Sequence, residues 1–412
     1  MGRFGKLIKL DSTIIKYYFI IMLYEGIDKL FGTVYVAHMG IRGLTSFQIG
    51  QVLAISSIAL SIFDYPTGNI ADKYGRKRSL VLGFFIWSIG LLVFFQASNL
   101  FTFILSILLW AIGVSLISGT PGAWFVDEIT KEGRSHLKAK VFPNANAISL
   151  IFGAIVALLS SVLAIGRPDF PLLVAGIMAL GTSIILIFIL NENYGDRAIS
   201  FRKALVRNTI DIFKSTTMRL ILIYSMTGRI AFQTFVMIWQ LYMVKELKLP
   251  TAYLGFTMAI FLVVLAMGNS LAGILLKRFE GVKVSIMGQG LIAIASITIA
   301  SHTSIVAFYI GACLIELGLG IDMSASSVWV HDLIPSERRA SYISAISAAG
   351  SLFGFTIPLV SGYIADQIGF RYNWLLAFIG SIITITLLIK IGTAIRAVRE
   401  GIQNIEKSKY LD

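Results

Sequence analysis

Cysteine and histidine are scarce in this chain of 412 residues. The single cysteine, Cys313, lies inside an apolar run, so no disulfide can form within the chain and no thiolate metal cluster is indicated. The four histidines, His38, His136, His302 and His331, are scattered and lack the spacing of metal ligands. We therefore expect no metal site.

Charged residues are also few. They make up 14% of the chain, against about 25% in a typical soluble domain. No Gly-x4-Gly-Lys-Ser/Thr phosphate loop is present, which argues against an ATP-driven pump. No stretch outside the apolar runs is long enough for a catalytic domain, so we expect neither an enzyme nor a cofactor. With 56% hydrophobic residues, the composition is that of a membrane protein.

Apolar runs follow one another along nearly the whole chain. A membrane-spanning helix needs about 20 mostly apolar residues. We identify twelve such runs: 14–37, 46–70, 79–97, 100–126, 141–165, 171–191, 219–244, 251–276, 283–301, 304–332, 339–365 and 371–395. The sequence therefore predicts an all-α membrane protein with twelve transmembrane helices.

One connection is much longer than the others. Residues 192–218 are charged, and Phe201, Leu205, Ile212 and Phe213 recur at near-helical spacing. This pattern predicts an amphipathic helix on the cytoplasmic membrane surface. We expect it to link a six-helix half of residues 1–191 to a second half of residues 219–412.

The basic residues are distributed unevenly about these runs. If both termini are cytoplasmic, all but seven of the 35 Lys and Arg residues lie on that side. Two of the seven, Lys29 and Arg229, lie inside predicted helices. The five on the other side are Arg42, Arg167, Lys245, Lys248 and Arg371. This asymmetry favours two cytoplasmic termini, and it explains the net charge of +13 without a nucleic-acid partner.

Two segments of the chain repeat each other. PGAWFVDEITKEGR at 121–134 aligns with SSVWVHDLIPSERR at 326–339 at an offset of 205 residues, which pairs Trp124 with Trp329 and Asp127 with Asp332. A weaker match pairs GNIADKYGRK at 68 with GNSLAGILLKR at 268. Parallel repeats of this kind indicate two similar halves that rock against each other in a transporter.

The loop after the second run, GNIADKYGRKRSL, resembles the signature G-x-L-A-D-R-x-G-R-K-x-x-L of the major facilitator superfamily. The matching residues are Gly68, Ala71, Asp72, Gly75, Arg76, Lys77 and Leu80. The preceding DYPTG resembles the acidic-x-Pro-Thr-Gly form of one branch of that superfamily. Together with the twelve runs and the repeat, the resemblance covers essentially the whole chain.

This resemblance implies a gate at the cytoplasmic side. In the family, the Asp and Arg of the signature, here Asp72 and Arg76, form a charge relay with an Asp at the end of the fourth helix, here Asp127. The relay latches the two halves together when the carrier opens outward. Gly68 and Gly75 would permit close helix approach and a tight turn. The simpler alternative is that Arg76 and Lys77 only keep this loop on the cytoplasmic side of the membrane, although Asp72 would then be unnecessary.

Six ionisable residues lie deep inside predicted spans, where each costs at least ~2.5–3.5 kcal/mol and usually serves a transport pathway. They are Glu25, Asp28, Lys29, Arg229, Glu316 and Asp322. Glu25 and Lys29 are one helical turn apart, with Asp28 close by. We expect Glu25 or Asp28 to take up a proton and Lys29 to orient the substrate. The alternative is a neutral pair that fixes helix packing.

Polar residues also lie in the seventh and tenth runs. Arg229 shares a helix face with Gln233 and suits a carboxylate or phosphate partner, which can be the substrate or a protein carboxylate. Glu316 and Asp322 are separated by about 120° around their helix, so at least one lies between helices. We take all four as candidate substrate-binding residues.

The fourth and fifth runs lack the Arg-Gln-Gly and Gly-Pro elements of the family's drug–proton antiporters. The sequence therefore favours proton-coupled symport of a small organic solute by a monomer in the cytoplasmic membrane, energised by the proton gradient. Proton-coupled efflux of an amphipathic or cationic compound is the first alternative. A receptor that binds its ligand without moving it is the second.

Overall fold

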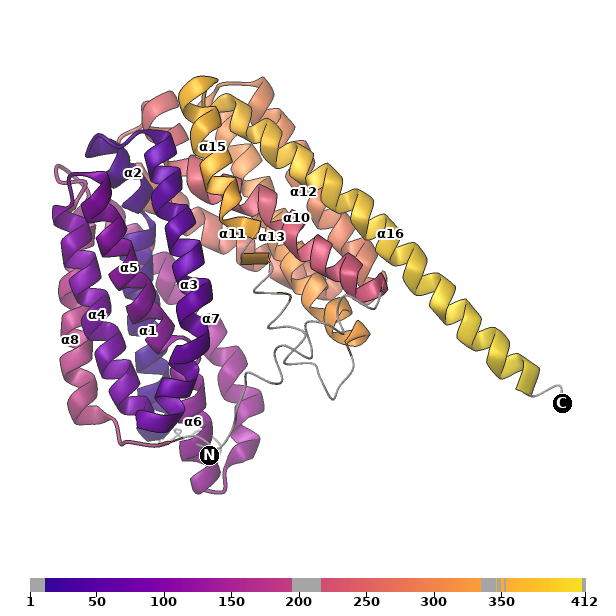
Figure 1. Cartoon of the computed structure of the whole chain (residues 1–412), viewed down its shortest axis with the longest axis horizontal. Helices are drawn as coiled ribbons and strands as arrows, with labels where there is room; N and C mark the ends of the chain where they lie inside the picture. The colour runs from indigo at the N-terminus through magenta and orange to yellow at the C-terminus, as the bar shows by residue number, and fades with distance from the viewer. Residues whose placement is uncertain (1–11, 195–215, 335–345, 347–349, 352, 410–412) are drawn as a thin grey trace, which may run out of the picture. The chain divides into compact units, whose positions relative to one another are not determined.

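The computed structural model describes residues 12–194, 216–334, 346, 350, 351 and 353–409. The chain divides into two compact units (Figure 1). The N-terminal unit contains Met1–Ile199 and Leu249–Ile260, and the C-terminal unit contains Ser200–Lys248 and Phe261–Asp412. The predicted halves meet at the linker 192–218, of which residues 195–215, with Phe201, Leu205, Ile212 and Phe213, lie outside the described residues.

Helices form both units. Those of the N-terminal unit are α1 (Ser12–Gly32), α2 (Tyr35–Ile41), α3 (Ser46–Tyr74), α4 (Arg76–Gln96), α5 (Leu100–Ile117), α6 (Thr120–Lys131), α7 (Lys138–Leu163) and α8 (Phe170–Ile189). Those of the C-terminal unit are α10 (Thr216–Leu241), a π-helical turn (Tyr242–Glu246), α12 (Gly281–Ser301), α13 (Ile305–Leu333), α15 (Thr356–Gln367) and α16 (Arg371–Lys409). Helix α11 (Tyr253–Leu275) begins in the first unit and ends in the second.

Local sequence signals set several helix ends. Thr45 and Gln48 form a capping box at the start of α3, and Asn99 and Thr102 form another at the start of α5. Gly75, at a φ of 112°, makes the turn between α3 and α4, where a residue with a side chain would be strained. The predicted tight turn at Gly75 is therefore present.

Three predicted helices differ from the structure by more than a few residues at their ends. The run 100–126 is two helices, because Gly119, at a φ of 71°, breaks the chain between α5 and α6. The run 14–37 is divided between α1 and α2, and α16 continues to Lys409, well past the predicted end at 395. Hydropathy alone does not detect a turn inside an apolar run or a polar continuation of a helix.

Ten stretches of the described chain are long and apolar enough to cross a membrane. Helix α1 is not among them, because every window long enough to span contains Lys16, Glu25, Asp28 and Lys29. The predicted run 339–365 is only partly described, with α15 near its end. A total of twelve spanning helices therefore remains a prediction.

The two units pack their helices through the same kind of glycine crossing. In the N-terminal unit α4 packs against α5 and α8, and in the C-terminal unit α12 packs against α13 and α16. A Cβ atom on Gly113 would lie 2.6 Å from the backbone nitrogen of Trp87, and one on Gly318 would lie 2.5 Å from the carbonyl oxygen of Gly288. Gly113 and Gly318 are 205 residues apart, which is the offset of the sequence repeat.

Candidate functional site

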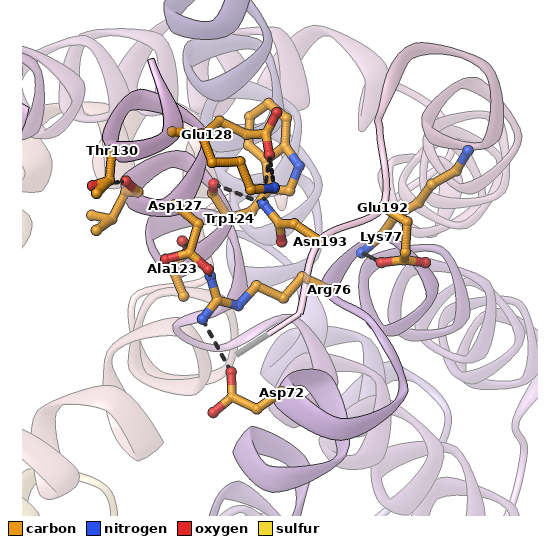
Figure 2. Close-up of polar contacts among 12 residues, drawn as sticks. Asp72, Arg76, Lys77, Ala123, Trp124, Asp127, Glu128, Thr130, Glu192 and Asn193 are labelled. Atoms are coloured by element: carbon orange, nitrogen blue, oxygen red, sulfur yellow. Dashed lines mark hydrogen bonds and ion pairs between the residues drawn. The ribbon is translucent and has the colours of Figure 1, made fainter. Parts of the chain in front are cut away.

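Arg76, the first residue of α4, lies at the centre of a polar cluster in the N-terminal unit (Figure 2). Its guanidinium is bonded to three acceptors, although the residue is only 7% exposed. Nη1 donates to the carbonyl oxygen of Ala123 at 2.6 Å and to the carboxylate of Asp127. Nη2 donates to Asp72 Oδ1 at 3.1 Å. Asp72 belongs to α3 and Asp127 to α6, so one side chain joins three helices.

The chain segment that follows α8 holds the start of α4 in place. Glu192 accepts hydrogen bonds from the backbone nitrogens of Lys77 at 2.8 Å and Arg78 at 3.3 Å. These nitrogens lie in the first turn of α4, where backbone N–H groups have no partner inside the helix and the helix dipole favours a negative charge. A Cβ atom on Gly75 would lie 2.5 Å from Glu192 Oε1, so the glycine also makes room for this carboxylate.

Asn193 ties the same segment to α6. Its side-chain nitrogen donates to the carbonyl oxygen of Trp124 and to Glu128 Oε1, both at 3.1 Å. The backbone carbonyl oxygen of Asn193 accepts a hydrogen bond from the backbone nitrogen of Arg76 at 3.0 Å. The indole nitrogen of Trp124 donates to the carbonyl oxygen of Asn191 at 3.1 Å. Asn193 is 2% exposed, so these bonds are made away from water.

The contacts of the predicted latch residues differ. Asp72, Arg76 and Asp127 meet, whereas Lys77 enters the cluster through its backbone nitrogen. Gly68 lies within the unbroken helix α3. Glu192 and Asn193 are not among the residues predicted from the sequence. A usable signal was present, since an acidic and an amide residue directly follow the sixth apolar run, on the side where basic residues predominate.

A second polar group lies within α1. Lys29 Nζ is 3.1 Å from Glu25 Oε1 and 2.9 Å from Asp28 Oδ2. The side chains of Lys29 and Glu25 are only 16% and 17% exposed. A Cβ atom on Gly153 of α7 would lie 3.2 Å from Glu25 Oε1, so α7 packs closely over the pair. Two carboxylates thus share one ammonium group.

A third group lies on α10 in the C-terminal unit. Arg229 and Gln233 are one turn apart and both are partly buried. They face Gly350 and Gly354, where a Cβ atom would lie 2.6 Å from Arg229 Nε and 3.4 Å from Gln233 Nε2, respectively. Within the described residues of the C-terminal unit, no carboxylate forms an ion pair with Arg229.

Asp322 of α13 is buried, and protein groups occupy both its oxygens. Tyr224 donates its hydroxyl hydrogen to Oδ1 at 2.8 Å, and Gln289 Nε2 donates to Oδ2 at 2.7 Å. The carboxylate therefore joins α10, α12 and α13, which agrees with a position between helices. Direct substrate contact by Asp322 remains a prediction, as does that by Glu316, which lies on the same helix.

Comparisons with known proteins agree on one family. A sequence profile of the Major Facilitator Superfamily matches residues 17–239 and 220–404. The uncharacterized MFS-type transporter MJ1560 of Methanocaldococcus jannaschii is 19% identical over 342 residues, which covers 83% of this chain and 88% of that protein. The uncharacterized MFS-type transporter YxaM of Bacillus subtilis is 32% identical over 95 residues, and this match spans about a quarter of each chain, 23% and 24%.

Solved transporter structures share the fold. A point mutant of the nucleoside transporter NupG superposes with a TM-score of 0.82 and 15% identity, covering 92% of this chain and 99% of that one. The D-xylose–proton symporter superposes with a TM-score of 0.70 and 14% identity, covering 92% and 96%. Identity this low gives the fold and leaves the substrate open.

Proposed function

The chain belongs to the Major Facilitator Superfamily and is a multi-pass membrane transporter, and we propose that it carries a small organic solute inward together with a proton. The units alternate in exposing the solute to the two sides of the membrane. Both termini are cytoplasmic in this proposal, twelve helices span the cytoplasmic membrane, and the carrier works as a monomer. The similarity to a D-xylose–proton symporter supports a proton-coupled cycle.

The observation that carries the proposal is the group of Glu25, Asp28 and Lys29 in α1. Two carboxylates around one ammonium group have a net charge of −1 when all three are ionised, and one bound proton makes the group neutral. Protonation of one carboxylate breaks its ion pair and frees Lys29 for another partner. Ionisable groups inside a membrane serve transport or proton transfer more often than they serve helix packing alone. We assign proton uptake to Glu25 or Asp28 and substrate orientation to Lys29.

The cluster around Arg76 supplies the gate in this proposal. Asp72, Arg76 and Asp127 close the cytoplasmic side while the carrier faces outward, and their ion pairs separate when it faces inward. Arg76 suits this role because its planar guanidinium can bond several acceptors at once.

The test uses purified protein in liposomes that contain a pH-reporting dye, challenged from outside with separate pools of peptides, sugars, organic acids and cationic drugs. Substrate entry that acidifies the lumen would support symport, whereas alkalinisation would mean antiport. With the active pool, Glu25→Gln should abolish proton-driven accumulation and leave exchange of bound solute intact. Asp28→Asn is the matched variant, and equal loss of both activities in both variants would contradict the assignment.

A further inference from the structure

Arg229 is a cation within a membrane-spanning helix, and no anion lies beside it among the described residues of its own unit. It lies in the middle of α10, within the candidate span Met218–Glu246. Among the residues of the C-terminal unit that the structure describes, no carboxylate lies within ion-pair distance of its guanidinium. Asp322, the buried carboxylate bonded by the same helix, is already occupied by Tyr224 and Gln289. A charge held in a span without a partner in its own unit is costly and marks a pathway for an ion or a substrate.

The neighbouring side chain of Gln233 also has hydrogen-bond donors that are not used within the described residues. Gln233, one turn along α10, makes no side-chain hydrogen bond to any part of the chain that is described. Its amide offers two N–H donors beside the five of the guanidinium. The two residues therefore present a row of donors with a single positive charge.

Two glycines that face α10, Gly350 and Gly354, make room for this row. A Cβ atom on Gly350 would lie 2.6 Å from Arg229 Nε and 3.3 Å from Cδ, too close for any residue with a side chain unless Arg229 moved. A Cβ atom on Gly354 would lie 3.4 Å from Gln233 Nε2. Gly350 thus leaves the Arg229 guanidinium room that a side chain would take, and Gly354 lies in contact range of the Gln233 amide.

We infer that Arg229 and Gln233 bind a carboxylate group of the transported solute. This inference rests on the proposed transport function and names the substrate class as small carboxylates, including zwitterions with a free carboxylate. A guanidinium forms two parallel hydrogen bonds to a carboxylate, and the Gln233 amide can supply a third. One cation with a neutral amide matches the single charge of a carboxylate better than the charge of about −1.5 to −2 on a phosphate ester.

The test measures binding to the full chain, purified in detergent, through the shift of its thermal unfolding. The carboxylate probes are lactate, succinate and glutamate. Inorganic phosphate and glycerol 3-phosphate form a second arm, and xylose and uridine form a neutral arm. We expect protection by at least one carboxylate and by neither of the other arms. Protection by none of the carboxylates, or by phosphates or neutral solutes in their place, would overturn the inference.

Variants then locate the site. Arg229→Gln should weaken binding of the protective carboxylate about tenfold or more, because a charged hydrogen bond is lost. Arg229→Lys keeps the charge, and it should still weaken binding because the two-pronged geometry is gone. Arg278→Gln, which removes a positive charge outside the helices, is the control and should bind as the parent does.

The glycines give a second, independent pair of variants. Gly350→Ala should displace Arg229 and weaken binding, whereas Gly273→Ala, whose Cβ would meet nothing within 4 Å, should leave it unchanged. Unchanged binding in both Arg229 variants or in Gly350→Ala would refute the site. Since binding in detergent needs no gradient, carboxylate binding without lumen acidification would refute symport and leave the site standing.

Discussion

His38 and Arg76 are two buried basic side chains of the N-terminal unit with opposite surroundings. Arg76 is bonded to a carbonyl oxygen and two carboxylates, so its charge is compensated. His38, on the short helix α2, is 2% exposed and lies against the rings of Phe94 and Phe103, and within the described chain its Nε2 has no hydrogen-bond partner. Burial is thus compatible with a charged Arg76 and opposes a charged His38.

The surroundings of His38 predict a dependence of stability on pH. Burial, with a further contribution from Arg42, lowers the pKa of His38 to about 4. A histidine in the unfolded chain takes up its proton near pH 6.5, so between these values the unfolded state binds more protons. The free energy of unfolding should therefore fall as the pH drops from about 6.5 to about 4, by at most about 3 kcal/mol.

This dependence can be measured as the midpoint of thermal unfolding in detergent across that pH range. His38→Gln cannot take up a proton in either state, so its stability should change less between pH 6.5 and 4 than that of the parent. His302→Gln, which replaces an exposed histidine, is the control. Parallel pH profiles for the parent and His38→Gln would show that His38 is not the responsible group.

At the scale of a helix, the start of α4 depends on a carboxylate from another part of the chain. Glu192→Ala removes the acceptor of two backbone N–H groups, and the loss of such a cap costs about 0.5–2 kcal/mol. It should also loosen Arg76, since the same turn carries both contacts. We expect a lower unfolding temperature together with a lower rate of transport.

Glu132→Ala is the matched control, since it removes a carboxylate of the same unit that bonds Arg134 and Thr13 at the surface. It should change the unfolding temperature little, because exposed ion pairs contribute about 0–1 kcal/mol. Equal effects of the two substitutions would mean that the cap on α4 has no special role.

The same element shows how far sequence can predict a site. The contacts of Arg76 with Asp72 and Asp127 could be predicted, because Asp72 lies four residues before Arg76 and Asp127 lies near a helix end. Glu192 and Asn193 could be noticed as polar residues directly after the sixth apolar run, but the groups that they bond could not be predicted. Both residues bond segments that are distant in sequence, and such contacts depend on how helix ends meet rather than on spacing within one helix.

At the scale of the whole chain, hydropathy predicted the positions of most helices because each must bury about 20 apolar residues in lipid. The divided run 100–126 shows the limit, since its break at Gly119 depends on backbone conformation within a stretch that stays apolar. Of the charges inside spans, only pairs on one helix, such as Glu25 and Lys29, could be placed together from sequence. Partners on different helices, such as Tyr224 and Asp322, required the fold.

The orientation of the whole chain can be tested through its single cysteine. In a Cys313→Ser background, Ser98→Cys and Ser135→Cys each place a single thiol at an exposed position, where it replaces the small hydroxyl group of a serine. With both termini cytoplasmic, a membrane-impermeant thiol reagent should label position 98 in intact cells, and position 135 only after permeabilisation. The reverse pattern would overturn the predicted orientation.

The offset of 205 residues between the glycine crossings separates what the two halves share from what they do not. Gly83 and Gly113 recur as Gly288 and Gly318, whereas Arg76 has Gly281 at the equivalent position. The close approach of neighbouring helices is therefore common to both units, while the charge of Arg76 has no counterpart at the equivalent position of the second half.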